Sequence, residues 1–494
     1  MKKTFFPLTL LLVSLLLTGC ASSSSVGAPD DGTKRQFRGA WIQAVNGQWT
    51  GVGRDNMQRT LTYQLDELQK DGVNAIIFQV RPECDALYES KLEPWSRFLT
   101  GQQGLAPQPY WDPLQWMVDE CHRRGMELHA WINPYRAKTK TTNELATSHV
   151  AVKHPDWVFS YDGLYILNPA LEASRQYTCR VVEDIVSRYD VDGLHIDDYF
   201  YPYPVAGQQI PDTQLYQQTG GAFASIGDWR RHNVDLLIRD LHKTIHRVKP
   251  WVKFGVSPFG IYRNKKNDPN GSLTNGLQNY DDLYADVLTW LENGWVDYLV
   301  PQLYWEIGNK AADYKELIQW WNRYAAQRPL YIGEDVERTA KFGDMAQKMQ
   351  LHEQMKNVGG TVLWYAKAAV DNVGGYGTQL RNSYWRTMAL HPRMDFIDGI
   401  APKPIRKPKV IETGEGPVIF WKAPKGNGWK NEAVKYVVYR FRQGEPIHIA
   451  NTSHIIATTT NTFLRISPDR VMATYVITAL DRMGNESEGR SVVF

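Results

Sequence analysis

Short apolar runs and helical patterns alternate along most of the chain. Between Phe37 and Leu390, segments that fit β-strands are separated by longer segments in which apolar residues recur every three or four positions. The expected strands are Arg38–Val45, Val73–Arg81, Met126–Asn133, Gly193–Asp197, Val252–Pro258, Asp297–Tyr304, Leu330–Gly333 and Thr361–Tyr365. The expected helices are Met57–Lys70, Pro113–Arg124, Leu171–Tyr189, Trp229–Val248, Tyr280–Asn293, Tyr314–Gln327, Met345–Asn357 and approximately Thr378–Leu390. This alternation predicts parallel strands whose outer face is covered by helices.

Eight such units predict a (β/α)₈ barrel of the TIM type, an α/β fold that spans residues 37–400. The alternative is a doubly wound open sheet, which usually carries a glycine-rich phosphate-binding turn after its first strand. Here the first strand leads into Asn46, Gly47, Gln48 and Trp49, which do not form such a turn. The pattern therefore favours the barrel.

A different pattern follows the Pro/Lys-rich segment 401–409, which is the expected linker. Residues 410–494 alternate apolar and polar side chains in short runs, and this predicts a small all-β sandwich. The segment Tyr475–Ser487 resembles the final hairpin of fibronectin type III domains. No catalytic grouping occurs in this region, so a spacer and a carbohydrate-contacting module are both open.

The first 20 residues have the pattern of an export signal. Two lysines precede an apolar run that is too short to span a membrane and that ends in Leu17–Cys20. This ending resembles the bacterial lipoprotein lipobox, which implies that Cys20 carries lipid, including palmitate, and begins the mature chain. Residues 21–36 are the expected flexible tether. Ser22 stands where an Asp would resemble the inner-membrane retention signal, so in a cell with two membranes an outer-membrane lipoprotein that faces the periplasm is expected.

Composition narrows the possible functions. The net charge is only +3 without a strong Lys/Arg cluster, which gives no support to nucleic-acid binding. Besides Cys20 the chain has Cys84, Cys121 and Cys179, and their spacing resembles no zinc site and no disulfide framework. No metal or other cofactor is therefore expected, and Cys121 and Cys179 are expected to be buried thiols. The 18 Trp and 26 Tyr residues suit both a core and the apolar faces of sugar rings.

The segment Asp192–Pro202 places two adjacent carboxylates, Asp197 and Asp198, directly after an apolar strand core. Side chains alternate along a strand, so His195 and Asp197 share one face. A carboxylate at a buried strand end is costly unless its charge is used there. One use of such a carboxylate is structural, as a helix cap or in an ion pair. The carboxyl end of a barrel strand, however, is where barrel enzymes place catalytic residues.

Other predicted strands also end in polar and aromatic residues that share faces. These sets are Gln79 with Arg81, His129 with Trp131 and Asn133, and Gln302 with Tyr304 and Glu306. A glycosidase needs one carboxyl group to protonate the leaving oxygen and a second to attack the anomeric carbon or to activate water. It also needs polar side chains that bind hydroxyl groups and aromatic rings that pack against the sugar. The predicted rim offers all of these groups.

Six ordered segments also resemble the glycosyl-hydrolase-like 10 family of bacterial envelope barrels, some of which act on peptidoglycan near the division site. The segments are Gln79–Tyr88, Glu93–Ser96, His129–Arg136, Asp192–Pro202, Gly255–Asn264 and Pro301–Trp305. The resemblance covers most of residues 37–390 and implies a TIM-type barrel that hydrolyses glycan strands.

A second resemblance concerns the fourth strand alone. Gly193–Asp197 is similar to the fourth-strand segment of α-amylase-type barrels, whose final Asp is the nucleophile. His195 stands where amylases have Arg, and Ser257 ends the fifth strand where they have the acid/base Glu. The general acid therefore does not carry over from that comparison.

Asp197 is accordingly the expected nucleophile or base. Asp198 would support it or exchange roles with it, because adjacent carboxylates push each other's proton affinities apart. Glu306 is the expected general acid because it falls on the inward face of the sixth strand, with Asp85 and Glu334 in reserve. The expected sugar-binding residues are Arg81, Asp85, His129, Trp131, Asn133, Tyr135, Gln302, Tyr304 and Trp305. Structural roles stay open for Trp131 in the barrel core and for Arg81 paired with Asp85.

The expected function is hydrolysis of peptidoglycan glycan strands by an exported, lipid-anchored enzyme linked to cell-wall remodelling at division. An enzyme for another polysaccharide would use the same barrel and anchor. A non-catalytic glycan-binding scaffold would keep the aromatic residues without needing paired acids. Retaining and inverting chemistry both stay open, because they differ in a carboxylate separation that no sequence pattern reports.

Overall fold

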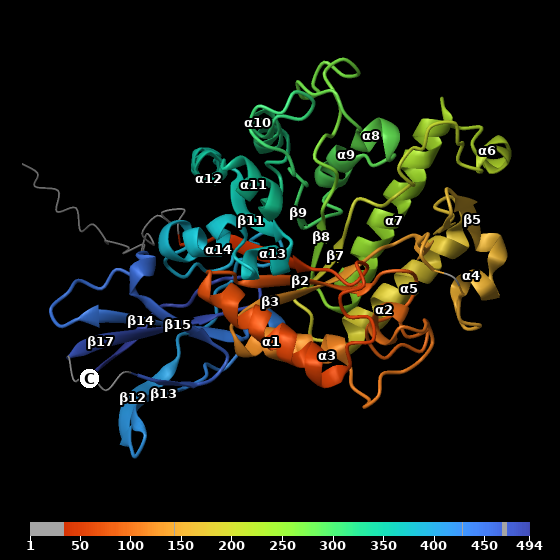
Figure 1. The fold of residues 1–494 in the computed structure, drawn as a ribbon. Helices are drawn as coiled ribbons and strands as arrows, with labels where there is room; N and C mark the ends of the chain where they lie inside the picture. The colour runs from red at the N-terminus through yellow and green to blue at the C-terminus, as the bar shows by residue number, and fades with distance from the viewer. Residues whose placement is uncertain (1–33, 143, 427, 467–471) are drawn as a thin grey trace, which may run out of the picture.

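Eight parallel strands close into a barrel in the computed structural model, which describes residues 34–142, 144–426, 428–466 and 472–494 (Figure 1). The barrel strands are β1 (Phe37–Ile42), β2 (Ala75–Arg81), β3 (Glu127–Ile132), β7 (Gly193–Ile196), β8 (Lys253–Val256), β9 (Tyr298–Leu299), β10 (Leu330–Asp335) and β11 (Val358–Trp364). Each strand pairs with the next in this order, and β11 pairs with β1 to close the ring. The predicted TIM-type barrel is confirmed. The export signal, Cys20 and most of the tether lie outside the described residues.

Helices cover the outside of the barrel and its connecting segments. They are α1 (Arg54–Lys70), α2 (Arg97–Thr100), α3 (Pro113–Arg123), α4 (Val150–Lys153), α5 (Glu172–Arg188), α6 (Thr213–Thr219), α7 (Ile226–Val248), α8 (Asn279–Asp282), α9 (Val287–Glu292), α10 (Tyr314–Tyr324), α11 (Val336–Phe342), α12 (Met345–Gln354), α13 (Ala366–Val370) and α14 (Tyr376–Gln379). The local sequence explains α3: Asp112 accepts a hydrogen bond from Gln115 N, and Pro113 fills the first helical position. Helices long and apolar enough to cross a bilayer are absent from the described part of the chain.

Strand alternation separates two cores. One face of each barrel strand packs against the helices, through residues such as Phe78, Leu128 and Ile196. The opposite face fills the barrel with aromatic side chains, and Phe37 stacks on Tyr331 with a centroid distance of 4.3 Å. The barrel is therefore a packed core with a site only at an end.

Three expected elements differ in the structure. The helix expected at Tyr280–Asn293 is divided into α8 and α9, because Tyr284 adopts a left-handed conformation (φ 56°) and Asp286 caps a new helix. The last expected helix ends early, in a π-helical turn at Leu380–Tyr384. The sixth strand is only two residues long; Pro301, which follows it closely, has no N–H to give to a ladder.

A small sheet that the sequence pattern did not reveal follows β3. It consists of β4 (Arg136–Lys138), β5 (Val158–Tyr161) and β6 (Leu164–Leu167), in the order β4-β6-β5. Figure 1 places it with α4 and α6 at the side of the barrel that lies away from the blue C-terminal domain. It therefore belongs to the end of the barrel where the strands finish.

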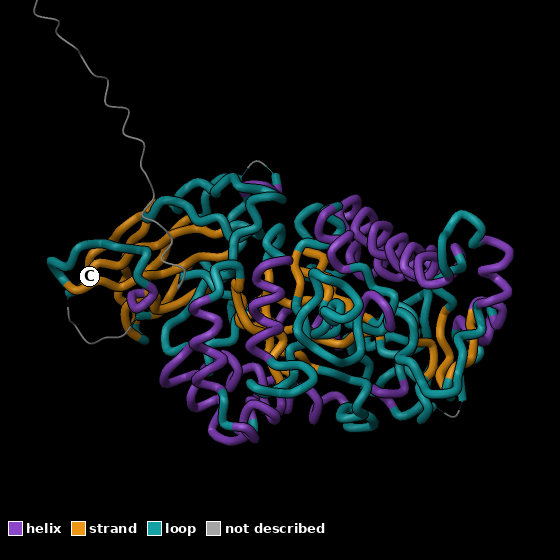
Figure 2. Tube along the Cα trace, turned by 90° about the horizontal axis from the view of Figure 1, so that it is seen from above, coloured by secondary structure: helices purple, strands orange, loops and turns teal. Residues whose placement is uncertain are grey.

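The C-terminal region forms a small all-β domain of two antiparallel sheets, as predicted. Its strands are β12 (Arg406–Thr413), β13 (Gly416–Lys422), β14 (Lys435–Arg442), β15 (Ile455–Thr459), β16 (Phe463–Arg465), β17 (Ala473–Leu480) and β18 (Arg490–Val493). The sheets have the orders β12-β13-β16 and β15-β14-β17-β18, and Figure 2 shows these strands gathered beside the helix-covered barrel. The fibronectin type III resemblance stays a prediction.

This domain packs against the amino-terminal ends of the barrel strands. Lys435 Nζ donates to Gly125 O, just before β3, at 2.7 Å, and Arg482 pairs with Asp190, just before β7, at 3.0 Å. The opposite end of the barrel, where the strands finish, stays free of it.

Candidate active site

Asp197 and Asp198 follow β7 directly and lie at the carboxyl end of the barrel. Asp197 is 5% exposed and Asp198 is 2% exposed. Barrel enzymes assemble their active sites at this end, because the loops after the strands converge there. The two carboxyl groups therefore have the position that a catalytic pair requires.

Two side chains of the neighbouring strand segment hold Asp197. Trp131 Nε1 donates to Asp197 Oδ2 at 3.1 Å, and Asn133 Nδ2 donates to Asp197 Oδ1 at 3.2 Å. Asn133 is oriented in turn, since its Oδ1 accepts from Arg136 N at 2.7 Å. Burial raises the pKa of Asp197, and Arg136, Trp131 and Asn133 offset only part of this effect. Both oxygens of Asp197 are thus fixed in place.

Asp198 is held from the other side. The Tyr203 hydroxyl donates to Asp198 Oδ2, and Gln302, which follows β9, also stabilises the carboxylate. Burial, and then the charge of Asp197, raise the pKa of Asp198 to about 7. A carboxyl group with this pKa carries its proton at neutral pH for much of the time, as a general acid must.

Aromatic rings form the floor beneath the pair. Tyr304 stacks on Trp364 at a centroid distance of 6.1 Å, and Trp41 and Trp131 meet Trp364 edge-on at 6.1 and 6.2 Å. Such a surface suits the apolar face of a pyranose ring.

A cavity of about 370 Å³ lies next to the pair: neither carboxyl group lines it, but Tyr203, which donates to Asp198, does. Its lining is mostly aromatic or aliphatic and comes from the small sheet and from the loop after Asp198; it includes Tyr135, Arg136, Tyr161, Leu164, Tyr199, Pro202 and Tyr203. The Arg136 guanidinium lies over the Tyr199 ring at 5.0 Å, and its Nε donates to Pro82 O at 3.0 Å. The cavity therefore combines sugar-sized apolar walls with one cation.

Comparison with known proteins agrees with this geometry. The Glycosyl hydrolase-like 10 family matches residues 36–348, which include the barrel strands from β1 to β10. This chain belongs to the glycosyl hydrolase-like 10 family. Glycosyl hydrolase YngK of Bacillus subtilis (strain 168) is 38% identical to it over 473 residues, which cover 92% of each chain. Glycosyl hydrolase DigH of Escherichia coli (strain K12) is 36% identical over 405 residues, covering 72% of this chain and 92% of DigH.

Among solved structures, the glycoside hydrolase domain of PgaB (BpsB) from Bordetella bronchiseptica matches 70% of this chain and 98% of that domain. The TM-score is 0.48 at 10% identity. As a member of the glycosyl hydrolase-like 10 family, the protein is a glycoside hydrolase.

Glu306 does not have the environment of the expected general acid in this family member. It lies well beyond β9, where strand alternation no longer fixes its direction. Asn309 Nδ2 donates to it at 2.7 Å and Arg338 pairs with it at 3.4 Å. Burial raises its pKa, but the backbone, Asn309 and Arg338 outweigh burial, so the pKa is lowered. A carboxyl group that is ionised in this way is a poor proton donor at neutral pH.

Three of the expected sugar contacts are enclosed by protein. Arg81 is 0% exposed and forms an ion pair with Glu93 at 2.6 Å, and not with Asp85. His129 is 0% exposed inside the barrel, between Tyr298 and Glu127. Asp85 is buried, accepts from Gln103 Nε2 at 3.0 Å, and has its pKa raised to about 7 by burial and then by Glu83. The expectation that these side chains contact sugar is corrected, since none of them reaches the cleft.

The reserve acid Glu334 is also enclosed. Lys348 Nζ lies 2.7 Å from its carboxylate, and the Thr339 hydroxyl donates to it as well. Asn133 and Trp131 have a role different from the expected one: they are buried and hold Asp197. Tyr135 is buried in the cavity wall, whereas Gln302, Tyr304 and Trp305 are only half-buried at the rim. For these last three, contact with sugar stays a prediction.

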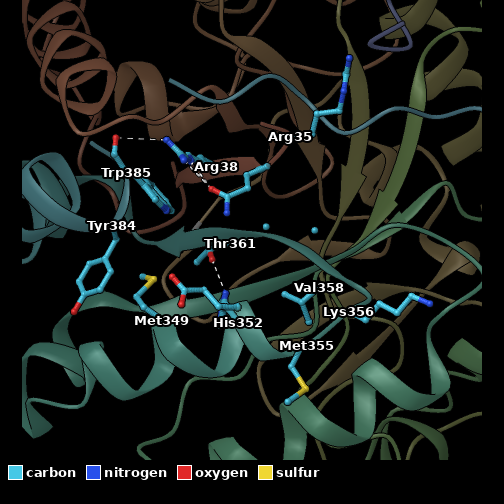
Figure 3. Close-up of a pocket in the computed structure, with 14 residues that line it drawn as sticks. Arg35, Arg38, Met349, His352, Met355, Lys356, Val358, Thr361, Tyr384 and Trp385 are labelled. Atoms are coloured by element: carbon cyan, nitrogen blue, oxygen red, sulfur yellow. Dashed lines mark hydrogen bonds between the residues drawn. The ribbon is translucent and has the colours of Figure 1, made fainter. Parts of the chain in front are cut away.

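The sequence pattern does not identify Tyr203 as a site residue, nor the part played by Arg136. Tyr203 stands in the aromatic, proline-marked segment after Asp198, so its side-chain type was visible but its contact was not. The cavity in Figure 3, about 430 Å³, lies at the other end of the barrel beside the starts of β1 and β11. Its lining includes Arg38, His352, Thr361 and Trp385, and neither Asp197 nor Asp198 belongs to it.

Proposed function

We propose that the enzyme hydrolyses the glycan strands of peptidoglycan, with Asp198 as the general acid and Asp197 as the nucleophile or base. The observation that carries the proposal is the pair of buried carboxyl groups at the barrel rim. They are held from opposite sides, by Trp131 and Asn133 on one and by Tyr203 on the other.

The roles of Asp198 and Asp197 are assigned from their protonation. Asp198, with its pKa near 7, gives its proton to the glycosidic oxygen as the bond to the anomeric carbon breaks. Asp197, whose two oxygens accept the N–H groups of Trp131 and Asn133, attacks the anomeric carbon or activates water. Water supplies the hydroxyl group of the new reducing end, either directly or after a glycosyl-enzyme intermediate.

Arg136 supports a preference for strands without stem peptides. Its Nε is bonded to a carbonyl, while its two Nη groups have no hydrogen-bond partner among the described residues and lie at the cavity wall. N-acetylmuramic acid carries a lactyl carboxylate, which is an amide while the stem peptide is attached and a free anion once the peptide is removed. A guanidinium group binds a free carboxylate in preference to an amide.

Digestion of purified peptidoglycan, with and without amidase treatment, tests the proposal. Mass spectrometry of the products should show glycan fragments from amidase-treated material. Asp197→Asn and Asp198→Asn should each lower the rate by about 10³-fold or more. Glu306→Gln is the matched control and should keep most of the activity. Activity only on another polysaccharide would reject the peptidoglycan assignment, and sugar binding without turnover in the parent chain would indicate a scaffold.

Arg136→Met separates the substrate preference from the chemistry. It should raise KM for amidase-treated strands and leave KM for uncharged N-acetylglucosamine oligomers unchanged, whereas any loss of kcat through Asp197 should be the same on both substrates. An equal loss on both substrates would assign Arg136 to support of Asp197.

We also propose, from the signal pattern, that Cys20 anchors the enzyme in the outer membrane facing the periplasm, in cell-wall remodelling at division. Metabolic labelling with palmitate should mark the parent chain and not Cys20→Ala. Labelling of both chains would reject Cys20 as the anchor.

A further inference from the structure

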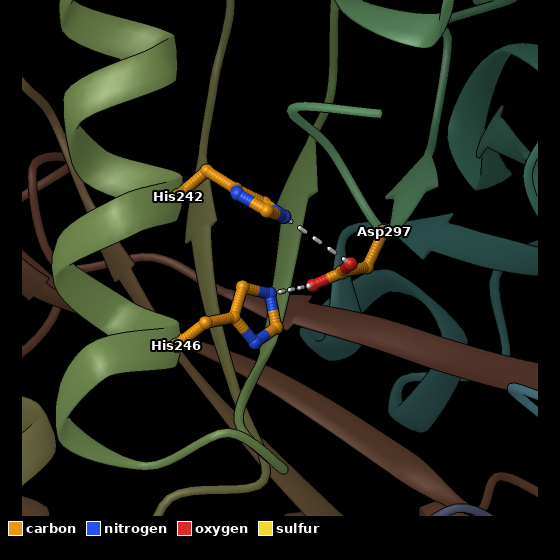
Figure 4. A group of neighbouring side chains, drawn as sticks. All are labelled: His242, His246 and Asp297. Carbon is orange, nitrogen blue, oxygen red and sulfur yellow. Dashed lines mark hydrogen bonds and ion pairs between the residues drawn. The ribbon is translucent and has the colours of Figure 1, made fainter. Parts of the chain in front are cut away.

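Two imidazoles and a carboxylate converge at the amino-terminal end of the barrel, far from Asp197 in the fold. His242 and His246 stand one helical turn apart on α7, and Asp297 directly precedes β9 (Figure 4). His246 Nε2 lies 3.0 Å from Asp297 Oδ2, and His242 Nε2 lies 3.9 Å from Asp297 Oδ1. The three donor atoms all lie within 4.8 Å of one another.

A second His–Asp pair in the barrel shows what an ordinary structural contact looks like here. His122 Nε2 on α3 lies 2.8 Å from Asp192 Oδ2, which also accepts Leu128 N of the preceding barrel strand. Asp297 Oδ2 accepts Phe254 N of β8 in the same way. The two sites differ one turn earlier on the helix: α3 has Val118 there, and α7 has His242.

His246 is oriented as a metal ligand would be. Its Nδ1 lies 3.0 Å from Pro250 O, and a carbonyl oxygen only accepts, so Nδ1 carries the hydrogen. Metal-binding histidines commonly donate their other ring N–H to a backbone carbonyl in this manner. The Nε2 lone pair then faces a carboxylate oxygen, and this arrangement calls for a cation between them.

The second imidazole makes a metal ion the better cation. A proton on His246 would satisfy its contact with Asp297, but it would leave His242 Nε2 3.9 Å from Asp297 Oδ1, too far for a hydrogen bond. One divalent ion satisfies both rings and the carboxylate at once. Arg328 lies near the group, but its Nε and Nη1 donate to Val296 O and Gln327 O.

We propose that His242, His246 and Asp297 bind one zinc ion, with water as the fourth ligand. Two imidazole nitrogens and one carboxylate oxygen form a donor set that suits Zn²⁺, whose ligand atoms stand about 3.3 Å apart in a tetrahedral site. The donor atoms, up to 4.8 Å apart, therefore close by up to about 1.5 Å on binding, through rotation of two imidazoles that are only partly buried.

The zinc ion would connect α7 to β9, the shortest strand of the barrel. β9 has two residues. It pairs with β10 through Leu299 and Leu330, and the segment after it adds a bridge between Gln302 and Gly333. Asp297 stands at the start of this strand and bonds to β8, so a metal held there ties the helix, β8 and β9 together.

Zinc binding to the untagged full chain, stripped with EDTA, tests the proposal. Titration calorimetry should find one equivalent of zinc per chain, and the Tm should rise by about 2–3 °C at about 100 times Kd. Cobalt should give the visible absorption of a tetrahedral site. His242→Val, which copies the α3 site, should weaken zinc binding by about tenfold or more and leave the Tm in EDTA unchanged. His232→Ala, at an exposed position on the same helix, should bind zinc as the parent chain does.

The proposal is overturned if the parent chain and His242→Val bind zinc equally, or if neither binds it. It is also overturned if His232→Ala loses the same equivalent. None of these readouts depends on glycan hydrolysis, so the result is independent of the proposed function.

Discussion

Carboxylates at the two ends of the barrel have different kinds of partner. At the amino-terminal end, Glu127 lies beside Lys253, His129 and His391, and Asp192 lies beside His122. At the carboxyl end, Asp197 and Asp198 have amide, indole and hydroxyl partners and lack an ion pair among the described residues. Glu127, Asp197 and Asp198 are all at most 5% exposed, so the difference between them lies in their partners.

The pKa directions follow this difference. Burial opposes the charge on Glu127, but His391 and Lys253 outweigh it and hold the pKa of Glu127 well below its usual range. His122 does the same for the pKa of Asp192. At the other end burial dominates and raises the pKa of Asp197 and Asp198. One end of the barrel stabilises the fold, and the other keeps a proton available for chemistry.

Replacing Glu127 should have the largest effect on stability. Glu127→Gln leaves Lys253 buried without its anion, and we expect it to lower the free energy of unfolding by about 3–5 kcal/mol. The rate of glycan hydrolysis per folded molecule should stay near that of the parent chain. Chemical unfolding and turnover of the same preparation measure both quantities, and a loss of turnover without loss of stability would break the comparison.

Replacing Asp198 should have the opposite effect on stability. The pKa of Asp198 is about 7 in the folded chain and 3.8 ordinarily, so the folded state loses stability as the pH rises between these values. Asp198→Asn does not ionise and avoids this loss. We expect the variant to be more stable than the parent chain by up to about 4 kcal/mol above pH 7, with the gap closing at acid pH.

Chemical unfolding of the parent chain and of Asp198→Asn across this pH range measures the difference between their free energies of unfolding. A stability gap that is the same at every pH would show that Asp198 does not titrate as the account requires.

Removing the Tyr203 hydroxyl should have the smallest effect. This hydroxyl stabilises the Asp198 carboxylate, so Tyr203→Phe should raise the pKa of Asp198 further. The alkaline limb of the activity profile should move up by about one pH unit. Tyr199→Phe, in the same loop, is the control and should leave the limb in place. A downward shift in Tyr203→Phe would contradict the hydrogen-bond direction.

The barrel and the position of Asp197 could be predicted because both depend on local periodicity. Apolar runs define the strands, and the segment Gly193–Asp197 places a carboxylate where a strand ends. The partners could not be predicted in the same way. The assignment of Glu306 extends strand alternation beyond Pro301. β9 ends at Leu299 and the bridges that follow it are made by Gln302, so no ladder fixes the direction of Glu306.

Burial was the second property that the sequence left undetermined. Strand alternation correctly places Arg81 and His129 on the inward face of their strands. It does not say how far a side chain lies from the rim of the barrel. His129 contacts Glu127 at the amino-terminal end of the barrel. Arg81 is paired with Glu93, which comes from a loop. The group of His242, His246 and Asp297 could not be predicted either, because it also depends on the fold. His242 and His246 are visible as neighbours on a helix, whereas Asp297 comes from a distant strand start and only the fold brings it to them.

The pH dependence of kcat/KM on amidase-treated peptidoglycan tests the central claim most directly. If Asp198 is the general acid, kcat/KM should fall tenfold per pH unit above about 7, and Glu306→Gln should keep the same limb. A profile whose alkaline limb moves in Glu306→Gln and stays fixed in Tyr203→Phe would contradict the assignment of the acid to Asp198.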